Sequence, residues 1–184
     1  MSNEKTERTF TTEYQTTIET VEIDEEITKI PSETFREFTA LQAVVIPTTV
    51  TTIEGIHVFR GCVSLTTISV TSGNRKYEDI DGVLVGTDEE GEKILMHYPV
   101  GKTETAYEIP ITITIIGESS FESSLNLNTI MIKGNVKEIN QYAFIYMTSL
   151  VSFSVEGNSN YEDVEGVLFG KMEGGKKLVQ YPLN

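Results

Sequence analysis

The strongest constraint on the fold of this 184-residue chain is an internal duplication. The segment Ile68–Gly86, ISVTSGNRKYEDIDGVLVG, returns as Phe153–Gly170, FSVEGNSNYEDVEGVLFG, and 11 of 18 aligned positions are identical when one residue is deleted. Both copies continue through a charged, glycine-containing turn to a Tyr-Pro ending, at Tyr98 and at Tyr181. The offset of about 85 residues predicts that the chain is two copies of one larger unit.

A finer hydrophobic pattern repeats four times within these copies. Its apolar residues are separated by steps of 2, 4, 3, 5 or 6, and 6 residues, which neither a helix of period 3.6 nor an alternating strand produces. The four sets are Val21, Ile23, Ile27, Ile30, Phe35, Leu41; Val44, Ile46, Val50, Ile53, Phe59, Leu65; Tyr107, Ile109, Ile113, Ile116, Phe121, Leu127; and Ile130, Ile132, Val136, Ile139, Phe144, Leu150. The pattern predicts a solenoid with turns of 23 or 24 residues, whose Ile, Phe and Leu positions stack into ladders.

Each copy is predicted to hold two regular turns and a third turn that opens into a β-hairpin. The hairpin strands are expected at Gly82–Gly86 with Ile94–Tyr98, and at Gly166–Gly170 with Leu178–Tyr181, around glycine-rich charged turns. The expected organisation is a polar N-terminal segment or cap at 1–17, a first copy at 18–106 and a second copy at 107–184.

The motifs of one turn resemble those of the BspA-like leucine-rich repeats (LRR_5 type). They are the strand Val44–Pro47, the step Val50–Ile53 and the corner Phe59–Leu65 with Cys62 at its centre. The resemblance covers residues 18–184, with Phe38, Ser124 and Met147 in place of the cysteine elsewhere and Lys133 in place of one proline. It implies a β-rich, right-handed leucine-rich repeat solenoid with short parallel strands, irregular or short-helical returns and two β-hairpin insertions.

No set of residues in the sequence predicts catalysis. The segment Gly117–Phe121 lacks the closing glycine of a nucleophile elbow. The two histidines, His57 and His97, lie 40 residues apart and are expected to be structural or at the surface. Cys62 occupies a position that Phe38 and Met147 fill in other turns, which favours an inert core thiol over a nucleophile. We therefore expect a protein that is not an enzyme.

The acidic turn around Gly82 resembles part of a calcium-binding loop without completing one. Asp79, Asp81 and Asp88 fall at positions 3, 5 and 12 of an EF-hand count, but position 1 is Tyr77, which cannot supply a carboxylate. The Asp-Gly pair is better explained as turn chemistry. No metal site and no cofactor are predicted.

Charge and hydropathy limit the kinds of partner that the chain can bind, but they do not decide in which compartment the protein is located. With 28 Asp and Glu against 14 Lys and Arg, the net charge of −14 argues against binding to nucleic acid. No apolar stretch approaches the roughly 18 residues of a membrane helix, and residues 1–16 contain no signal peptide. Two interpretations stay open, a cytosolic protein or a chain whose export signal has been removed. The family resemblance implies a cell-surface or secreted protein that contacts extracellular or host proteins.

A candidate binding surface follows from strand geometry, because alternate residues of a strand point outward. The expected outward row is Glu22, Val45, Ser69, Glu108, Met131 and Ser154, forming one continuous strand face. The leading hypothesis is a non-catalytic, adhesin-like protein–protein interaction module. The alternatives are a structural spacer within a longer repeat array and a cytosolic interaction protein. Weak end-to-end self-association is also expected, because Phe153 and Val155 stand in the last turn without an obvious cap.

Overall fold

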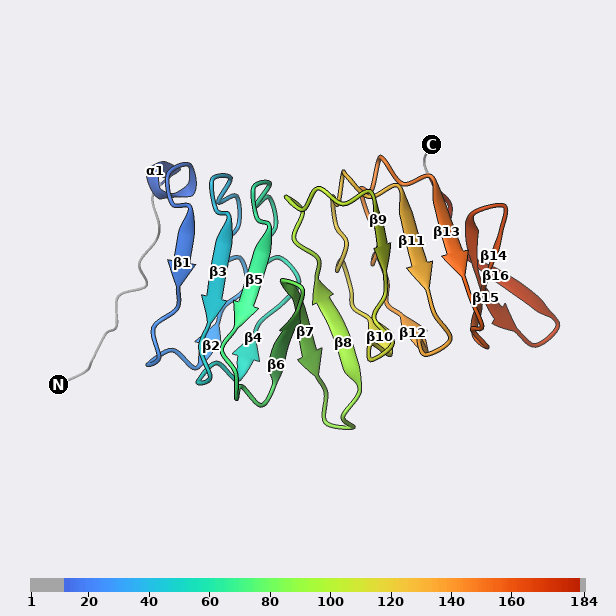
Figure 1. Cartoon of the computed structure of the whole chain (residues 1–184), viewed down its shortest axis with the longest axis horizontal. Helices are drawn as coiled ribbons and strands as arrows, with labels where there is room; N and C mark the ends of the chain where they lie inside the picture. The colour runs from blue at the N-terminus through green and yellow to red at the C-terminus, as the bar shows by residue number, and fades with distance from the viewer. Residues whose placement is uncertain (1–11, 183–184) are drawn as a thin grey trace.

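The computed structural model describes residues 12–182, which form an elongated coil of short strands (Figure 1). Residues 1–11 of the expected N-terminal segment lie outside the described part of the chain. The rest of that segment contains one helical turn, α1 (Thr12–Gln15). The side-chain amide of Gln15 donates to the carbonyl oxygen of Arg36 at 3.1 Å, so this segment contacts the first turn of the coil.

Parallel strands line one side of the coil in two groups of three. The first group is β1 (Thr20–Glu22), β3 (Ala43–Ile46) and β5 (Thr67–Val70), and the second is β9 (Ala106–Glu108), β11 (Thr129–Ile132) and β13 (Ser152–Val155). Val21 is aligned with Val44, and Val44 with Ile68, at separations of 23 and 24 residues. These separations equal the turn length predicted from the hydrophobic pattern, and the leucine-rich repeat solenoid is confirmed.

Two pairs of two-residue strands lie on the returning limbs. Their members are β2 (Lys29–Ile30) and β4 (Thr52–Ile53), and β10 (Ile115–Ile116) and β12 (Glu138–Ile139). The strands pair in parallel, β2 with β4 and β10 with β12. Beyond them the limbs are irregular, and backbone hydrogen bonds such as Phe35 N to Val58 O, 3.0 Å, join neighbouring turns. Within residues 12–182 the returns contain no helix, so they take the irregular form of the two expected.

The expected hairpins are present, and each is preceded by a further strand that the sequence pattern did not assign. The first three-stranded meander is β6 (Tyr77–Ile80), β7 (Val83–Thr87) and β8 (Lys93–His97), and the second is β14 (Tyr161–Val164), β15 (Val167–Met172) and β16 (Gly175–Gln180). Asp81 and Gly82, between β6 and β7, have φ of 52° and 78°. Positive φ at both central residues is typical of the tight turns that match strand twist, which confirms the turn role of this Asp-Gly pair.

The buried side chains follow the repeating pattern. The four corner leucines, Leu41, Leu65, Leu127 and Leu150, are at most 1% exposed. The Phe35 and Phe59 rings stack with centroids 5.6 Å apart, and so do Phe121 and Phe144. Between these pairs, His97 contacts Phe59 at 5.3 Å and Tyr98 contacts Phe121 at 5.4 Å. The end of the meander therefore takes the place that a phenylalanine has in a regular turn.

In each copy one asparagine side chain joins the start of the meander to the preceding turn of the coil by hydrogen bonds. We call this arrangement an asparagine clip. The Asn158 amide donates to the carbonyl oxygens of Lys133, 2.7 Å, and Val136, 2.9 Å. Its Oδ1 accepts from the backbone N–H groups of Asn160 and Tyr161. Asn74 in the first copy makes the corresponding bonds to Pro47 and Val50. One side chain thus satisfies four backbone groups where the chain leaves the regular coil.

Two sequence expectations are corrected. The strand face is not continuous, because β5 and β9 are not hydrogen-bonded and the meander β6–β8 lies between the two groups (Figure 1). Phe153 is not an exposed end residue either: it is 2% exposed, because the second meander covers it and its N–H donates to Gly166 O at 2.8 Å. In both cases the meander has a packing role that a local pattern does not reveal.

Candidate functional site

The predicted strand-face residues point outward in two separate rows. The aligned residues are Glu22, Val45 and Ser69 on β1, β3 and β5, and Glu108, Met131 and Ser154 on β9, β11 and β13. Val45 and Met131 are half-buried at the centre of their rows, while Glu22, Glu108 and Ser154 are exposed. Residues aligned in parallel strands share one face of the sheet. The structure therefore brings each trio together and keeps the trios apart.

An ion-pair network flanks the second trio. The Lys133 ammonium lies 2.6 Å from Glu156 Oε2 and 3.6 Å from Glu108 Oε2, so one lysine bridges β9, β11 and β13. The hydrogen bond from Lys133 holds the pKa of the Glu156 carboxyl below its usual value. Glu156 is itself exposed, and solvent weakens such pairs. The network therefore contributes little to the free energy of folding, and it places charged groups beside the second trio.

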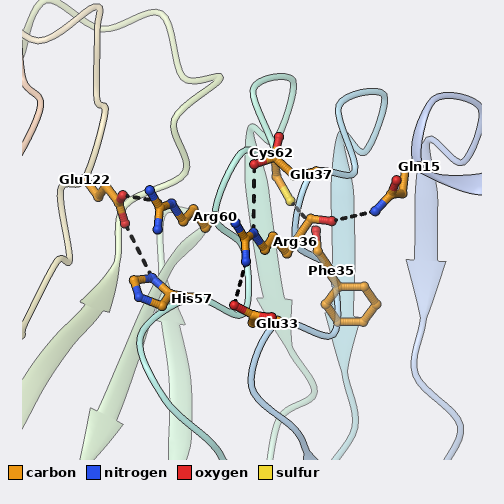
Figure 2. A network of polar contacts seen from close by, with 9 residues as sticks. All are labelled: Gln15, Glu33, Phe35, Arg36, Glu37, His57, Arg60, Cys62 and Glu122. Carbon is orange, nitrogen blue, oxygen red and sulfur yellow. Dashed lines mark hydrogen bonds and ion pairs between the residues drawn. The ribbon is translucent and has the colours of Figure 1, made fainter. Parts of the chain in front are cut away.

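A second polar cluster lies on the returning limbs (Figure 2). The Glu122 carboxylate is 3.3 Å from Arg60 Nε and 3.9 Å from His57 Nδ1, and only 10% of its side chain is exposed. On the neighbouring turn Arg36 pairs with Glu33 at 2.7 Å. Glu122 joins the second copy to the first across the meander, a contact between residues that are distant in sequence.

The only cysteine of the chain is a buried core residue. The Cys62 thiol is fully buried and donates to Phe35 O at 2.9 Å, while His57 is directed toward Glu122 (Figure 2). Burial raises the pKa of the Cys62 thiol to about 12, which disfavours the thiolate that a nucleophile requires. The predicted core role of Cys62 is confirmed.

His97 is a core histidine. It is 9% exposed and lies against the Phe59 ring, and burial lowers its pKa to about 4. Its imidazole is therefore neutral at pH 7 and contributes by packing. The expectation of a structural role for His97 is confirmed.

The described residues offer no evident metal centre. Within residues 12–182, no three His, Cys, Asp or Glu side chains are grouped closely enough to hold an ion. The same part of the chain contains no helix long and apolar enough to span a bilayer.

Sequence reasoning missed a groove at the C-terminal end of the coil, which lies against β15 and β16 and includes Lys177 and Leu178. Leu178 is 53% exposed, whereas Leu95, at the equivalent position of the first copy, is fully buried. Aligning the two Tyr-Pro endings pairs these leucines, which predicts the same burial for both, so the sequence holds no signal for this groove.

The chain belongs to the BspA-type leucine-rich repeat family. The family model matches six times, over residues 6–80 and 102–172. The two matched stretches flank β7 and β8, so the first meander is where this chain interrupts the regular repeat. A comparison with the curated proteins finds no match.

Solved structures of leucine-rich repeat proteins share the fold. One is a leucine-rich cell surface protein of Faecalibacterium prausnitzii, with 25% identity, a TM-score of 0.60, and coverage of 77% of this chain and 42% of that one. Another is a leucine-rich repeat protein of Eubacterium ventriosum, with 25% identity, a TM-score of 0.59 and coverage of 73% and 41%. The pneumococcal vaccine antigen PcpA, at 21% identity and a TM-score of 0.61, supports the fold alone, with coverage of 77% and 40%. The chain spans less than half the length of each of these proteins.

Proposed function

We propose that the chain is a non-catalytic protein-binding module of a cell-surface or secreted protein, and that the strand face is where it contacts its partner. The observation that carries this proposal is the pair of aligned outward trios, each with a half-buried aliphatic residue, Val45 or Met131, at its centre. Parallel strands of a solenoid give a rigid surface, so little conformational entropy is lost when a partner binds.

Similarity to a cell-surface protein of F. prausnitzii supports the location. The burial of Cys62 supports the absence of catalysis, because a buried thiol is not readily ionised. The alternatives are a structural spacer and a cytosolic interaction protein. Each of them predicts its own outcome in the binding experiment below.

The test compares the unchanged chain with a Val45→Glu, Met131→Glu variant. Each chain is immobilised and exposed to a pool of extracellular proteins and to a cytosolic extract, over a range of concentrations. We expect saturable binding from the extracellular pool that the variant loses, because two buried charges would be placed at the centres of the contact.

A matched control carries Val63→Glu and Val151→Glu, at valines that are 57% and 53% exposed and lie outside both trios. This control should bind like the unchanged chain. Saturable binding that survives in the strand-face variant would refute the proposed surface. Binding from the cytosolic extract alone would favour the cytosolic alternative, and no saturable binding from either would favour the spacer.

A further inference from the structure

The two copies of the repeat differ in what lies beside the last strand of the meander. In the first copy β10 pairs in parallel with β8, with Ile115 opposite Ile94 and Ile116 opposite Leu95. Backbone N–H groups of Thr114 and Gly117 donate to the carbonyl oxygens of Lys93, 3.0 Å, and Leu95, 2.9 Å. In the second copy β16 stands at the edge of its sheet, and no strand of the described chain pairs with its outer side (Figure 1).

The side chains of the unpaired strand are exposed where their equivalents are buried. Leu95 and Tyr98 are 0% and 2% exposed, whereas Leu178 and Tyr181 are 53% and 64% exposed. Met172, at the end of β15, is 60% exposed. Such a group of large apolar side chains beside an open strand edge is typical of a surface that another strand covers.

A groove of about 1030 Å³ lies between this meander and the returning limb of the turn before it. Its walls include Lys137, Tyr142, Tyr146, Lys171, Lys177 and Leu178. No aspartate or glutamate lines it, although the chain as a whole has a net charge of −14. Lys137 already pairs with Glu92, at 2.6 Å, while Lys177 has no carboxylate partner within residues 12–182. The groove therefore combines an unpaired cation, apolar side chains and a free strand edge.

We propose that this groove binds an extended acidic segment of a partner protein, which adds to β16 as a parallel strand. Its register follows from the first copy: the residue in the place of Ile115 lies opposite Lys177, and the residue in the place of Ile116 lies opposite Leu178. The segment accordingly carries a carboxylate at the first position and an aliphatic side chain at the second. Backbone hydrogen bonds supply affinity and the two side chains supply specificity. This site is separate from the strand face, and it does not depend on that face binding anything.

Charge decides between a different protein and a second copy of this chain. In a second copy the strand equivalent to β10 is β2, which has Lys29 in the place of Ile115. End-to-end stacking would set Lys29, which pairs with Glu54 of its own chain, opposite Lys177, where it offers no carboxylate of its own and like charges directly opposite in a sheet are destabilising. A carboxylate at that position has the reverse effect, so the groove fits an acidic partner strand better than the chain itself.

The test uses the segment that fills the equivalent place in the first copy. Two fluorescent 13-residue peptides carry the sequence of residues 111–123, one with Ile115→Glu and one with Ile115→Lys. Fluorescence anisotropy against the purified chain should show saturable binding of the glutamate peptide with a Kd below about 1 mM. The lysine peptide should bind roughly fivefold more weakly, the effect of an exposed charge pair.

Variants of the chain then locate the site. Lys177→Glu should reverse the order of the two peptides without affecting the fold, because Lys177 lies in an exposed strand. Lys176→Glu is the matched control: Lys176 is adjacent, lies outside the groove and pairs with Glu162 at 2.9 Å, so it should leave the order unchanged. Amide chemical shifts of the labelled chain should change at β16 and Tyr142 and not around Val45 or Met131.

Three results would overturn the proposal. They are no saturable binding of either peptide, equal binding of both, and shift changes on the strand face. Sedimentation equilibrium addresses the second copy as occupant: we expect a monomer mass at all concentrations. A dimer that Lys177→Glu strengthens would instead assign the groove to Lys29 of another copy.

Discussion

At the scale of single residues, the asparagine clips show how the chain leaves a regular coil without leaving backbone groups unpaired. Asn158 is 6% exposed, and its amide and carbonyl engage four backbone groups on two turns. The duplication places Asn74 and Asn158 at aligned positions, but the carbonyl oxygens that their amides bond are 22 to 27 residues away in sequence. A local pattern could therefore locate these residues without predicting what they do.

Replacing this clip should destabilise the fold. Asn158→Ala leaves buried carbonyl and N–H groups unsatisfied, at a cost of roughly 1–3 kcal/mol in the free energy of unfolding. The measurement is urea denaturation followed by circular dichroism. Asn160→Ala is the control, because Asn160 is exposed and its side chain makes a bond to Lys137 O at the surface. Equal losses in both variants would contradict the clip role.

His97 should make stability depend on pH. Burial lowers its pKa to about 4, below the value of about 6.5 for an unfolded chain. Between these two pKa values the unfolded state therefore binds more protons than the folded state. The stability that neutral His97 contributes is complete above pH 6.5 and is lost as the pH falls toward 4. The loss attributable to His97 is at most about 3 kcal/mol.

The comparison for this prediction is His97→Gln, which places in the first copy the residue found at the equivalent position, Gln180. Unfolding free energies of both chains are measured from pH 7 to pH 4, and their difference isolates His97 from the titrating carboxylates. A difference that stays constant with pH would show that His97 is not buried as a neutral group.

At the scale of elements, the tight turn that starts each meander determines how the meander meets the strand face. Gly82 has a positive φ, and a Cβ at this position would collide with the side chain of Thr67 on β5. Gly91, in the next turn of the same meander, also has a positive φ but has no atom within 4 Å of a built Cβ. A comparison of substitutions at these two glycines therefore distinguishes the energetic cost of backbone strain from that of steric contact.

Substitution by alanine should reveal the difference. Gly91→Ala is expected to cost about 1 kcal/mol from backbone strain alone. Gly82→Ala should cost about 1–3 kcal/mol more, because β7 must move away from β5. The measurement is the midpoint of denaturant unfolding, compared between variants whose unfolding free energy depends equally steeply on denaturant concentration. Equal effects of the two substitutions would mean that the contact with Thr67 relaxes freely.

Some strands could be predicted from the sequence and others could not. The inward positions of β3 and β11, such as Val44 and Ile130, were predicted from period-2 spacing and are fully buried. The leading strands β6 and β14 were not predicted, because their sequences, YEDI and YEDV, are acidic and read as part of a turn. They become strands by pairing with β7 and β15, which a local reading does not include.

At the scale of the whole molecule, the core divides into two clusters that meet at β7. Leu84 belongs to the cluster of the first turns, while Val83 and Val85 on the other face belong to the cluster of the second copy. The division of the chain at residues 106 and 107 stays a prediction. In a solenoid each turn contacts its neighbours only, so damage in one copy should spread less to the other.

A cavity in one copy tests this coupling. Leu127→Ala should reduce the free energy of unfolding by about 2–5 kcal/mol, and Leu41→Ala provides the mirror change in the first copy. Amide hydrogen exchange should lose protection mainly in residues 107–182 for Leu127→Ala and mainly in 18–84 for Leu41→Ala. Uniform loss of protection in both variants would show that the two copies unfold as one unit.

The sequence alone determined the repeat length, the inward residues and the tight turns, because each depends on neighbouring positions of one chain and on steric rules that act locally. It also determined that Cys62 is a core residue, since Phe38 and Met147 fill the same position in two other turns. The tertiary structure decided the rest. The split of the strand face, the pairing of Glu122 with Arg60 and the contrast between buried Leu95 and exposed Leu178 all depend on which turn stacks beside which. Stacking joins residues that are far apart in the chain, so no local pattern records it.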